Sequence, residues 1–182
     1  MGNTILIILM LCLNVAVYSQ PENKIYKKII HDYVLKQSQP NFKYSSTKLI
    51  VLEDPINMRK LNTNEFSRFK EKYKKLDEYT FIDFVKKNQV GLNFDSSSFS
   101  GIDIVMVNKE QSKNWNQLYS LYPNWNGSIL ELSNIGFNKE RDQAFVYYGF
   151  SSGPGVGGGI YIVFEKKREE WKPKKVIPAW AT

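Results

Sequence analysis

Cysteine and histidine are nearly absent from this chain, and each shortage excludes a class of chemistry. Among its 182 residues, Cys12 is the only cysteine and His31 is the only histidine. With no second residue of either kind to share an ion, the sequence predicts no zinc-type metal site. Serine catalysis would need His31 as its base and a G-x-S-x-G elbow, and no such elbow occurs. We therefore expect no catalytic residue of these kinds, no metal and no cofactor.

Charge is absent from the first nineteen residues, where Ile5 to Val17 is apolar apart from Asn14. Val17 and Ser19 stand at the minus-three and minus-one positions of a cleavage site before Gln20. This pattern is typical of a secretory signal peptide. The apolar run is shorter than the roughly 18–20 residues that a spanning helix needs, so we expect no permanent membrane span after cleavage.

The leader defines the expected organisation of the chain. Residues 1–19 are predicted to be removed, which leaves one exported domain over residues 20–182, in the periplasm or outside the cell. Cys12 leaves with the leader, so the mature chain is expected to form no disulfide. A chain of this length can bury a sizeable core without such cross-links.

Negative charge is in deficit. The chain has 18 Asp and Glu against 25 Lys and Arg, a formal net charge of +7, and all of these residues follow position 19. A positive surface allows weak association with anionic surfaces such as lipid head groups or acidic polysaccharide. Solubility alone also accounts for the charge, because the lysine runs are broken by carboxylates and aromatic residues. Export argues against nucleic acid as a partner, and we expect none.

The N-terminal half carries helical periodicity. Apolar residues recur every three or four positions, with charged residues between them, in the segments that start at Pro21 and Asn62. Asn62 is expected to cap its helix with Glu65 reaching back, and Thr80 to cap a third helix that stops before Gly91. The expected helices cover residues 21–37, 62–76 and 80–88, with one or two helical turns within 112–122.

The final third of the chain is rich in β-formers separated by turns, which predicts an antiparallel meander. One of its strands, Ala144 to Phe150, is apolar on both faces, so either both faces are covered or an aromatic face is left for a ligand. We expect an α+β domain in which N-terminal amphipathic helices pack on a mostly antiparallel sheet formed largely by the C-terminal half. The expected strands are 48–52, 102–107, 129–133, 144–150, 160–165 and 171–177.

The segment from Ser151 to Gly159 has five glycines in nine residues. It matches a G-x-G-x-x-G pattern, but a strand follows in place of the helix that would hold a pyrophosphate, so it does not predict nucleotide binding. Two interpretations stay open: a wide hairpin with positive-φ glycines and a bulge, or bare backbone that a ligand can approach closely. In the second interpretation the candidate binding residues are Tyr147, Tyr148, Ser151, Ser152, Gly153, Gly155, Gly157 and Tyr161.

Four aromatic residues, Trp115, Tyr119, Tyr122 and Trp125, lie within eleven positions among several asparagines. Aromatic faces beside amides suit sugar rings, so an alternative function is glycan binding, which predicts exposed and roughly coplanar rings. The helical spacing of Trp115, Leu118 and Tyr122 is equally typical of a buried stripe.

Paired carboxylates would support a further alternative, a cell-envelope hydrolase. That chemistry needs two acids roughly 5–10 Å apart across a cleft. The available acids are Glu53, Asp54, Asp95, Asp103 and Glu131, and their spacing in the sequence does not say which of them converge.

The C-terminal third resembles a module of uncharacterised exported bacterial proteins. The resemblance rests on Ile135-Gly136-Phe137-Asn138, Gln143 to Tyr147, the glycine-rich loop, Tyr161 to Lys167 and Trp171-Lys172. Those proteins carry two cysteines that bracket Gly-Pro in the loop, where this chain has Ser152 and Val156, so a disulfide clamp is absent here. The resemblance implies an exported bacterial setting and no known activity. The sequence as a whole favours a non-catalytic binding or interaction module, with an unknown envelope protein or glycan as its partner.

Overall fold

The computed structural model describes residues 21–35, 48–53, 61–99 and 101–182. The predicted signal peptide and the candidate acid Asp54 lie outside the described residues. The chain divides into two compact units, Met1–Pro40 and Asn41–Thr182. In the described ranges no helix is both long and apolar enough to cross a bilayer.

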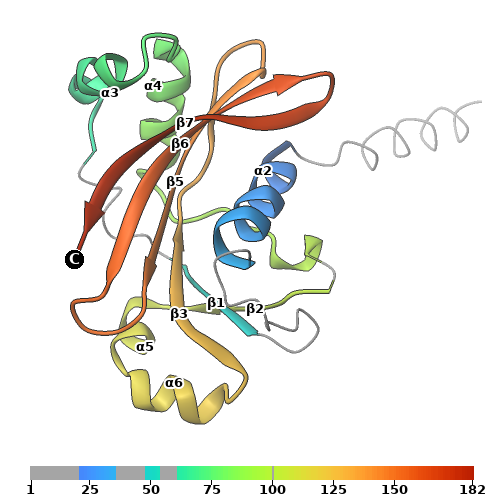
Figure 1. Ribbon diagram of the computed structural model, residues 1–182, viewed down its shortest axis with the longest axis vertical. Coiled ribbons are helices and arrows are strands. Elements are labelled where there is room, and N and C mark those ends of the chain that lie inside the picture. The colour runs from blue at the N-terminus through green and yellow to red at the C-terminus, as the bar shows by residue number, and fades with distance from the viewer. Residues whose placement is uncertain (1–20, 36–47, 54–60, 100) are drawn as a thin grey trace, which may run out of the picture. The chain divides into compact units, whose positions relative to one another are not determined.

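The second unit is built on a mixed sheet with the strand order β2-β1-β3-β5-β6-β7, and β4 pairs with β5 (Figure 1). Strands β3, β5, β6 and β7 are consecutive antiparallel neighbours, which confirms the predicted meander and the α+β fold class. The sequence did not predict that β1 runs parallel to both β2 and β3. The strands are β1 (Lys48–Leu52), β2 (Asp103–Val107), β3 (Trp125–Leu132), β4 (Gly136–Phe137), β5 (Gln143–Ser151), β6 (Gly157–Lys167) and β7 (Glu170–Ala181).

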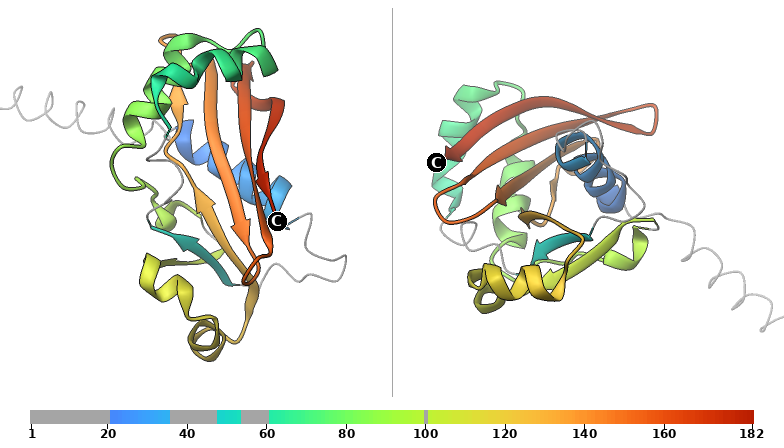
Figure 2. Two further views of the ribbon diagram at one scale, coloured as in Figure 1. Left: turned by 90° about the vertical axis from the view of Figure 1, so that its left-hand side faces the viewer. Right: turned by 60° about the horizontal axis from the view of Figure 1, so that its bottom comes forward.

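Helices of the second unit lie at two ends of the sheet, with α3 and α4 at one end and α5 and α6 at the other (Figure 2). Helix α4 is capped by Asp77, three residues before the predicted cap Thr80, because the Asp77 carboxylate accepts a hydrogen bond from the Thr80 N–H. Its last residue is Lys87, one residue before the predicted end at residue 88, and Asn88 is its C-cap. The helices are α3 (Phe66–Lys72), α4 (Glu78–Lys87), α5 (Lys109–Lys113) and α6 (Trp115–Leu121), with short 3₁₀ turns η4 (Thr63–Glu65) and η5 (Ser96–Ser98).

The end of α4 is held by a pair of buried amides. The Asn88 side chain donates to the carbonyl oxygens of Phe84 and Asn134, and the Asn134 side chain donates to the carbonyl oxygens of Lys87 and Gly91. These bonds satisfy carbonyl groups that a helix end leaves without partners. Asn88 therefore caps the end of the helix, a role that was predicted for Gly91. Through Asn134 it also connects the helix to the segment before β4.

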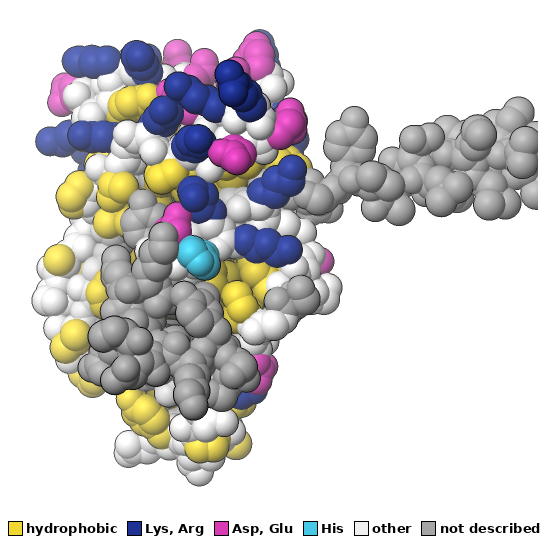
Figure 3. Space-filling view, turned by 45° about the vertical axis from the view of Figure 1, so that its right-hand side comes forward, with side chains coloured by type: hydrophobic (Ala, Val, Ile, Leu, Met, Phe, Trp, Pro, Cys, Tyr) yellow, Lys and Arg dark blue, Asp and Glu magenta, His cyan; other side chains and the backbone are white. Residues whose placement is uncertain are grey.

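The described part of the first unit is a helix, α2 (Pro21–Ile29), that continues as a π-helical turn, η1 (Ile30–Leu35). Pro21 opens it, as expected of a residue whose missing N–H costs nothing there. Ile25, Ile29 and Ile30 are buried. His31 is exposed, contacts Asp32, and is the cyan side chain in Figure 3. The prediction that this helix packs on the rest of the domain stays a prediction.

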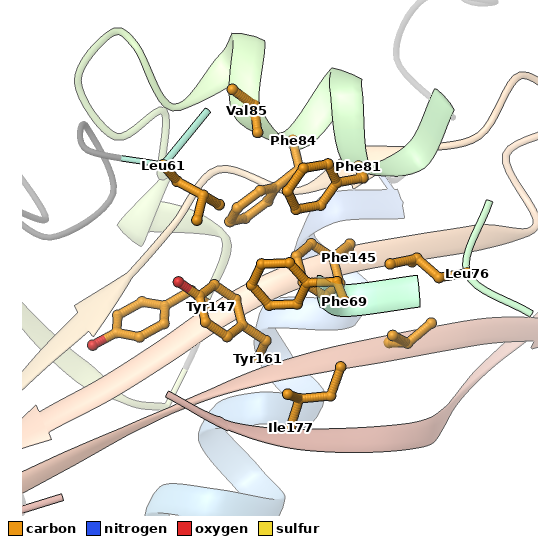
Figure 4. Close-up of a cluster of buried hydrophobic side chains, with 11 residues drawn as sticks. Leu61, Phe69, Leu76, Phe81, Phe84, Val85, Phe145, Tyr147, Tyr161 and Ile177 are labelled. Carbon is orange, nitrogen blue, oxygen red and sulfur yellow. The ribbon is translucent and has the colours of Figure 1, made fainter. Parts of the chain in front are cut away.

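The core under α3 and α4 is aromatic (Figure 4). Phe145 on β5 contacts the ring of Phe84 edge-on at 4.9 Å and stacks with Tyr161 on β6 at 5.4 Å. Phe69 on α3 contacts both Phe145 and Tyr161. Each such pair contributes about 0.5–1.5 kcal/mol beyond the burial of its area. This cluster fixes the two helices on the sheet.

The opposite face of the same strands is also buried. Val146, Ile162 and Phe164 are fully buried on that face, and Phe145, Tyr147 and Val163 are buried on the helix-covered face. Both faces of β5 are therefore covered, which explains why its sequence does not alternate between apolar and polar residues.

Gly136 on β4 allows the closest approach between α4 and the sheet. A Cβ atom at this position would lie within 2.5 Å of the Thr80 carbonyl oxygen and of the Phe84 Cβ. A Cβ atom at Gly91, by contrast, would meet nothing within 4 Å. The two glycines thus form a matched pair for testing the contact between α4 and β4.

We expect Gly136→Ala to destabilise the protein by about 1–3 kcal/mol, because the added methyl must push α4 away from β4. For a chain of this length, each kcal/mol lowers Tm by about 2–4 °C. Thermal unfolding followed by circular dichroism measures the effect. Gly91→Ala should leave Tm nearly unchanged, and equal losses in the two variants would contradict this account of Gly136.

Candidate functional site

One lateral row of residues crosses the four antiparallel strands. Glu131 on β3 pairs with Gly149 on β5, Gly149 pairs with Gly159 on β6, and Gly159 pairs with Trp180 on β7. Directly paired residues point to the same face of a sheet. Gly149 is two residues from Tyr147, which belongs to the aromatic cluster, so the row lies on the helix-covered face.

The row lies between two clusters of buried side chains on that face. On one side is the aromatic cluster under α3 and α4, which includes Tyr147 and Tyr161. On the other side, Ile129 on β3 packs with Leu118 on α6 and with Trp125. Glu131 is two residues from Ile129 on the same strand, so it brings a carboxyl group between two apolar clusters.

The glycines of the row make room for two rings of this chain. A Cβ atom at Gly149 or at Gly159 would lie 2.5 Å from the Tyr147 hydroxyl oxygen, and at Gly159 it would also lie 2.6 Å from Trp180 Nε1. A Cβ atom at Gly157 would lie 3.0 Å from the Trp180 ring. Tyr147 and Trp180 therefore occupy the space that side chains at these positions would fill.

A hydrogen-bond chain links the row. Trp180 Nε1 donates to the Tyr147 hydroxyl oxygen at 2.8 Å, and the Tyr147 hydroxyl bonds the Glu131 carboxyl group. The Glu131 Oε2 atom is buried and has no hydrogen-bond partner among the described residues. Burial raises the pKa of Glu131 above its ordinary value, and the bond from Tyr147 offsets part of that effect. Figure 4 shows Tyr147 and Tyr161 at one side of the aromatic cluster.

The glycine-rich loop is a tight turn that joins β5 to β6. The Ser152 N–H donates to the Val156 carbonyl oxygen at 2.9 Å, and the Val156 N–H donates back to the Gly153 carbonyl oxygen at 3.2 Å. Gly153 and Gly155 have φ angles of 138° and 71°, which favour glycine. The predicted hairpin with positive-φ glycines is thus confirmed, but the predicted bulge is wrong, because β5 and β6 pair without a register shift up to Ser151 and Gly157.

The base of the turn is tied to neighbouring strands. The Ser128 and Ser152 hydroxyls lie 2.8 Å apart, which links the turn to β3. The Thr182 N–H donates to the Gly157 carbonyl oxygen at 3.1 Å, which links it to the end of β7. Ser152 and Val156 are joined by a backbone hydrogen bond across the turn.

The structure separates the predicted binding residues into an interior set and a surface set. Tyr147 and Tyr161 are buried in the aromatic cluster, and Tyr148 is buried on the opposite face. Burial raises the pKa of Tyr148 and of Tyr161 to about 12, so both stay neutral phenols. Gly157 is buried and Ser151 and Gly153 are half-buried, while Ser152 and Gly155 are exposed.

The aromatic segment proposed for glycan binding packs on itself. Trp125 is only 6 % exposed and stacks with Trp115 at 5.1 Å, while Tyr119 lies 4.8 Å away at a tilt. Tyr122 is half-buried against the same cluster, and Tyr119 is the exposed member of the set. The Trp125 indole also donates to the Ser128 carbonyl oxygen. Its ring contacts are therefore made within the protein.

The remaining candidate acids have other structural partners. Asp95 accepts hydrogen bonds from Ser97 and Ser98, which lower the pKa of its carboxyl group, and Asp103 pairs with Lys48. Glu53 is exposed just after β1. Within the described ranges, no group of three or more His, Cys, Asp or Glu side chains could hold a metal ion.

Sequence reasoning missed part of the row. Neither Trp180 nor Gly149 was among the residues predicted to form a site. A signal was present, because a glycine inside an apolar strand often marks the close approach of another group. What the sequence could not supply is the register that places Gly149, Gly159 and Trp180 side by side.

We expect Glu131→Gln to gain stability relative to the parent protein as the pH rises from 4 to 8, because the amide cannot ionise and the desolvated Glu131 carboxyl group can. The raised pKa means that the folded chain binds the proton more tightly than the unfolded chain. The penalty of ionisation is therefore absent below the ordinary value of 4.5 and grows as the pH rises through the folded pKa.

Thermal unfolding of both proteins from pH 4 to pH 8 measures this effect. The Tm difference should be small at pH 4 and favour the variant at pH 8. The exposed Glu71→Gln on α3 is the control and should show no such trend. A constant difference across this range would contradict the assignment of a buried, ionisable Glu131.

Comparison with known proteins returns no counterpart of this chain. No family model matches it, and neither the curated proteins nor the solved structures contain a match.

Proposed function

We propose that this protein is an exported, non-catalytic binding module, and that the turn formed by residues 152–156 is the surface through which it contacts a partner protein outside the cytoplasm. The export part of the proposal rests on the leader pattern of residues 1–19. The contact surface rests on the geometry of the turn.

The observation that carries the proposal is an exposed apolar side chain on an anchored turn. Val156 is 54 % exposed, and Pro154 and Gly155 beside it are also exposed. The turn is closed by two backbone hydrogen bonds and tied to β3 through Ser128. Because such a turn is ordered before binding, it loses little conformational entropy when a partner packs against it.

The row beneath the turn supports a structural role for the interior residues. Tyr147 and Trp180 fill the space over Gly149 and Gly159, which holds β5, β6 and β7 in one register. We infer that the buried tyrosines position the turn, and that the partner contacts the exposed residues 152–156.

Acid catalysis receives less support. Glu131 is half-buried, with its Oε2 atom buried, and is bonded by Tyr147. Asp95 and Asp103 are exposed and are bonded to nearby serine and lysine side chains. An acid pair requires two carboxyl groups that face one cleft. Glycan stacking on Trp125 is also disfavoured, since the ring is buried against Trp115.

The test is site-specific photo-cross-linking in the native envelope, with a benzophenone amino acid in place of the exposed Pro154. Val156→Asp should abolish the cross-link to the partner, because a charge replaces the apolar contact. Val176→Asp is the matched control, since Val176 on β7 is another exposed valine at 39 %. A single cross-linked species that Val156→Asp removes and Val176→Asp retains is the expected result.

The proposal is wrong if both aspartate variants keep the cross-link, or if both lose it while their Tm values match that of the parent. Turnover of an envelope polymer that stops with Glu131→Gln would instead favour the hydrolase.

A further inference from the structure

Positive charge is concentrated at one end of the second unit. Three segments, residues 66–91, 138–142 and 165–175, together hold fifteen Lys and Arg against nine Asp and Glu. The other described residues of this unit hold three Lys and Arg against six Asp and Glu. We call the three segments the basic end. Positive charge is therefore unevenly distributed over the second unit, and its excess lies away from the turn 152–156.

Contacts show that the three segments are neighbours. The Tyr73 hydroxyl donates to Glu165 at 2.7 Å, which joins the segment after α3 to β6. The Lys166 N–H donates to the Asp142 carbonyl oxygen, and Lys139 lies over the Tyr79 ring of α4. In Figure 1 the same end of the sheet carries α3, α4 and the hairpin between β6 and β7, and in Figure 3 Lys and Arg side chains gather at that end.

The basic end also exposes apolar side chains in a stripe along α4. Tyr79 is 46 % exposed, Ile82 is 38 % exposed, and Val90, just beyond the helix, is 67 % exposed. Lys86 follows Ile82 by one helical turn and is exposed on the same side. The buried face of α4 is formed by Phe81, Phe84 and Val85, so Tyr79 and Ile82 lie on the outer face of an anchored helix. Val90 follows the end of that helix.

We propose that the basic end binds the surface of an anionic phospholipid membrane, with Tyr79, Ile82 and Val90 entering the head-group region and the surrounding lysines contacting lipid phosphates. Exposed lysines around a partly apolar helix face are the combination that holds peripheral proteins on anionic bilayers. A tyrosine at this position suits the interface, since its ring is apolar and its hydroxyl polar. A soluble polyanion would use the lysines and leave the apolar stripe in water.

The charges of the basic end are complementary to an anionic surface. The turn after α3 carries Lys74 and Lys75, and β7 carries Lys175, and all three are exposed within the basic end. The acids nearest the stripe are partly neutralised, since Asp83 pairs with Lys87 and accepts from the Phe137 N–H. Glu78 is the exposed acid of α4 and lies in its first turn.

The proposal is tested by sedimentation of the mature chain with vesicles of phosphatidylcholine and phosphatidylglycerol in a three-to-one ratio, and with pure phosphatidylcholine vesicles. Binding should require the anionic lipid and weaken as salt rises. Lys74→Glu with Lys75→Glu should lower the partition coefficient by about tenfold or more. Ile82→Asn should lower it by about threefold or more, because its side chain no longer leaves water.

Matched controls come from the other end of the sheet. Lys109→Glu with Lys113→Glu on α5 reverses the same number of charges, and Leu121→Asn on α6 removes an exposed apolar side chain. Both should bind vesicles within about twofold of the parent. Val156→Asp should also bind normally, which separates this proposal from the proposed function. Only variants whose Tm matches that of the parent protein are compared for vesicle binding.

Three outcomes would overturn the proposal: no sedimentation with anionic vesicles, equal losses in the α5 and α6 controls, or full binding by Ile82→Asn. The last result would mean that the lysines act alone and that a soluble polyanion is the better candidate.

Discussion

The rings of Tyr147 and Trp180 lie directly on the backbone of β5 and β6, in space that exists only because Gly149 and Gly159 have no side chains. The contact depends on the pairing of β5 with β6, since a shift that brought Ile160 to the place of Gly159 would put a Cβ under the Tyr147 hydroxyl. The hydrogen bond from the Trp180 indole to the Tyr147 hydroxyl fixes the orientation of the two rings relative to each other. The alignment of β5, β6 and β7, and with it the position of the turn above them, depends on this constraint.

The same contact explains the environment of Glu131. Its carboxyl group is bonded by a hydroxyl that is already held by an indole, so it does not need water for that bond. The Oε2 atom is buried without a partner among the described residues, which makes ionisation costly. An acid with a buried carboxyl oxygen limits stability near neutral pH.

Local signals in the sequence predicted much of the fold. The meander followed from β-rich runs and turns, and the cap at Asn62 followed from its side-chain chemistry. The parallel pairing of β1 with β2 and β3 could not be predicted, because partners far apart in sequence leave no local pattern. Asp77 replaced Thr80 as the cap of α4, since both residues have capping side chains and only the backbone geometry decides between them.

The candidate site was predicted only in part for the same reason. The turn at residues 152–156 was found from its glycines, because positive φ angles have a compositional signature. The row beneath the turn has no such compositional signature. Its members, Glu131, Gly149, Gly159 and Trp180, are brought together by the pairing of the strands. Tyr147 was assigned to a binding face from its aromatic character, whereas the packing of α3 and α4 places it in the interior.

The position of β1 has a consequence for the order in which the sheet assembles. β1 lies between β2 and β3, and its register pairs Lys48 with Trp125, far along the chain, while β5, β6 and β7 pair through short connections. Closing a long loop costs more entropy than closing a hairpin, and non-local pairing slows folding. We expect the antiparallel strands to associate early and β1 to enter late, which makes the β1–β3 pairing the step that limits the refolding rate.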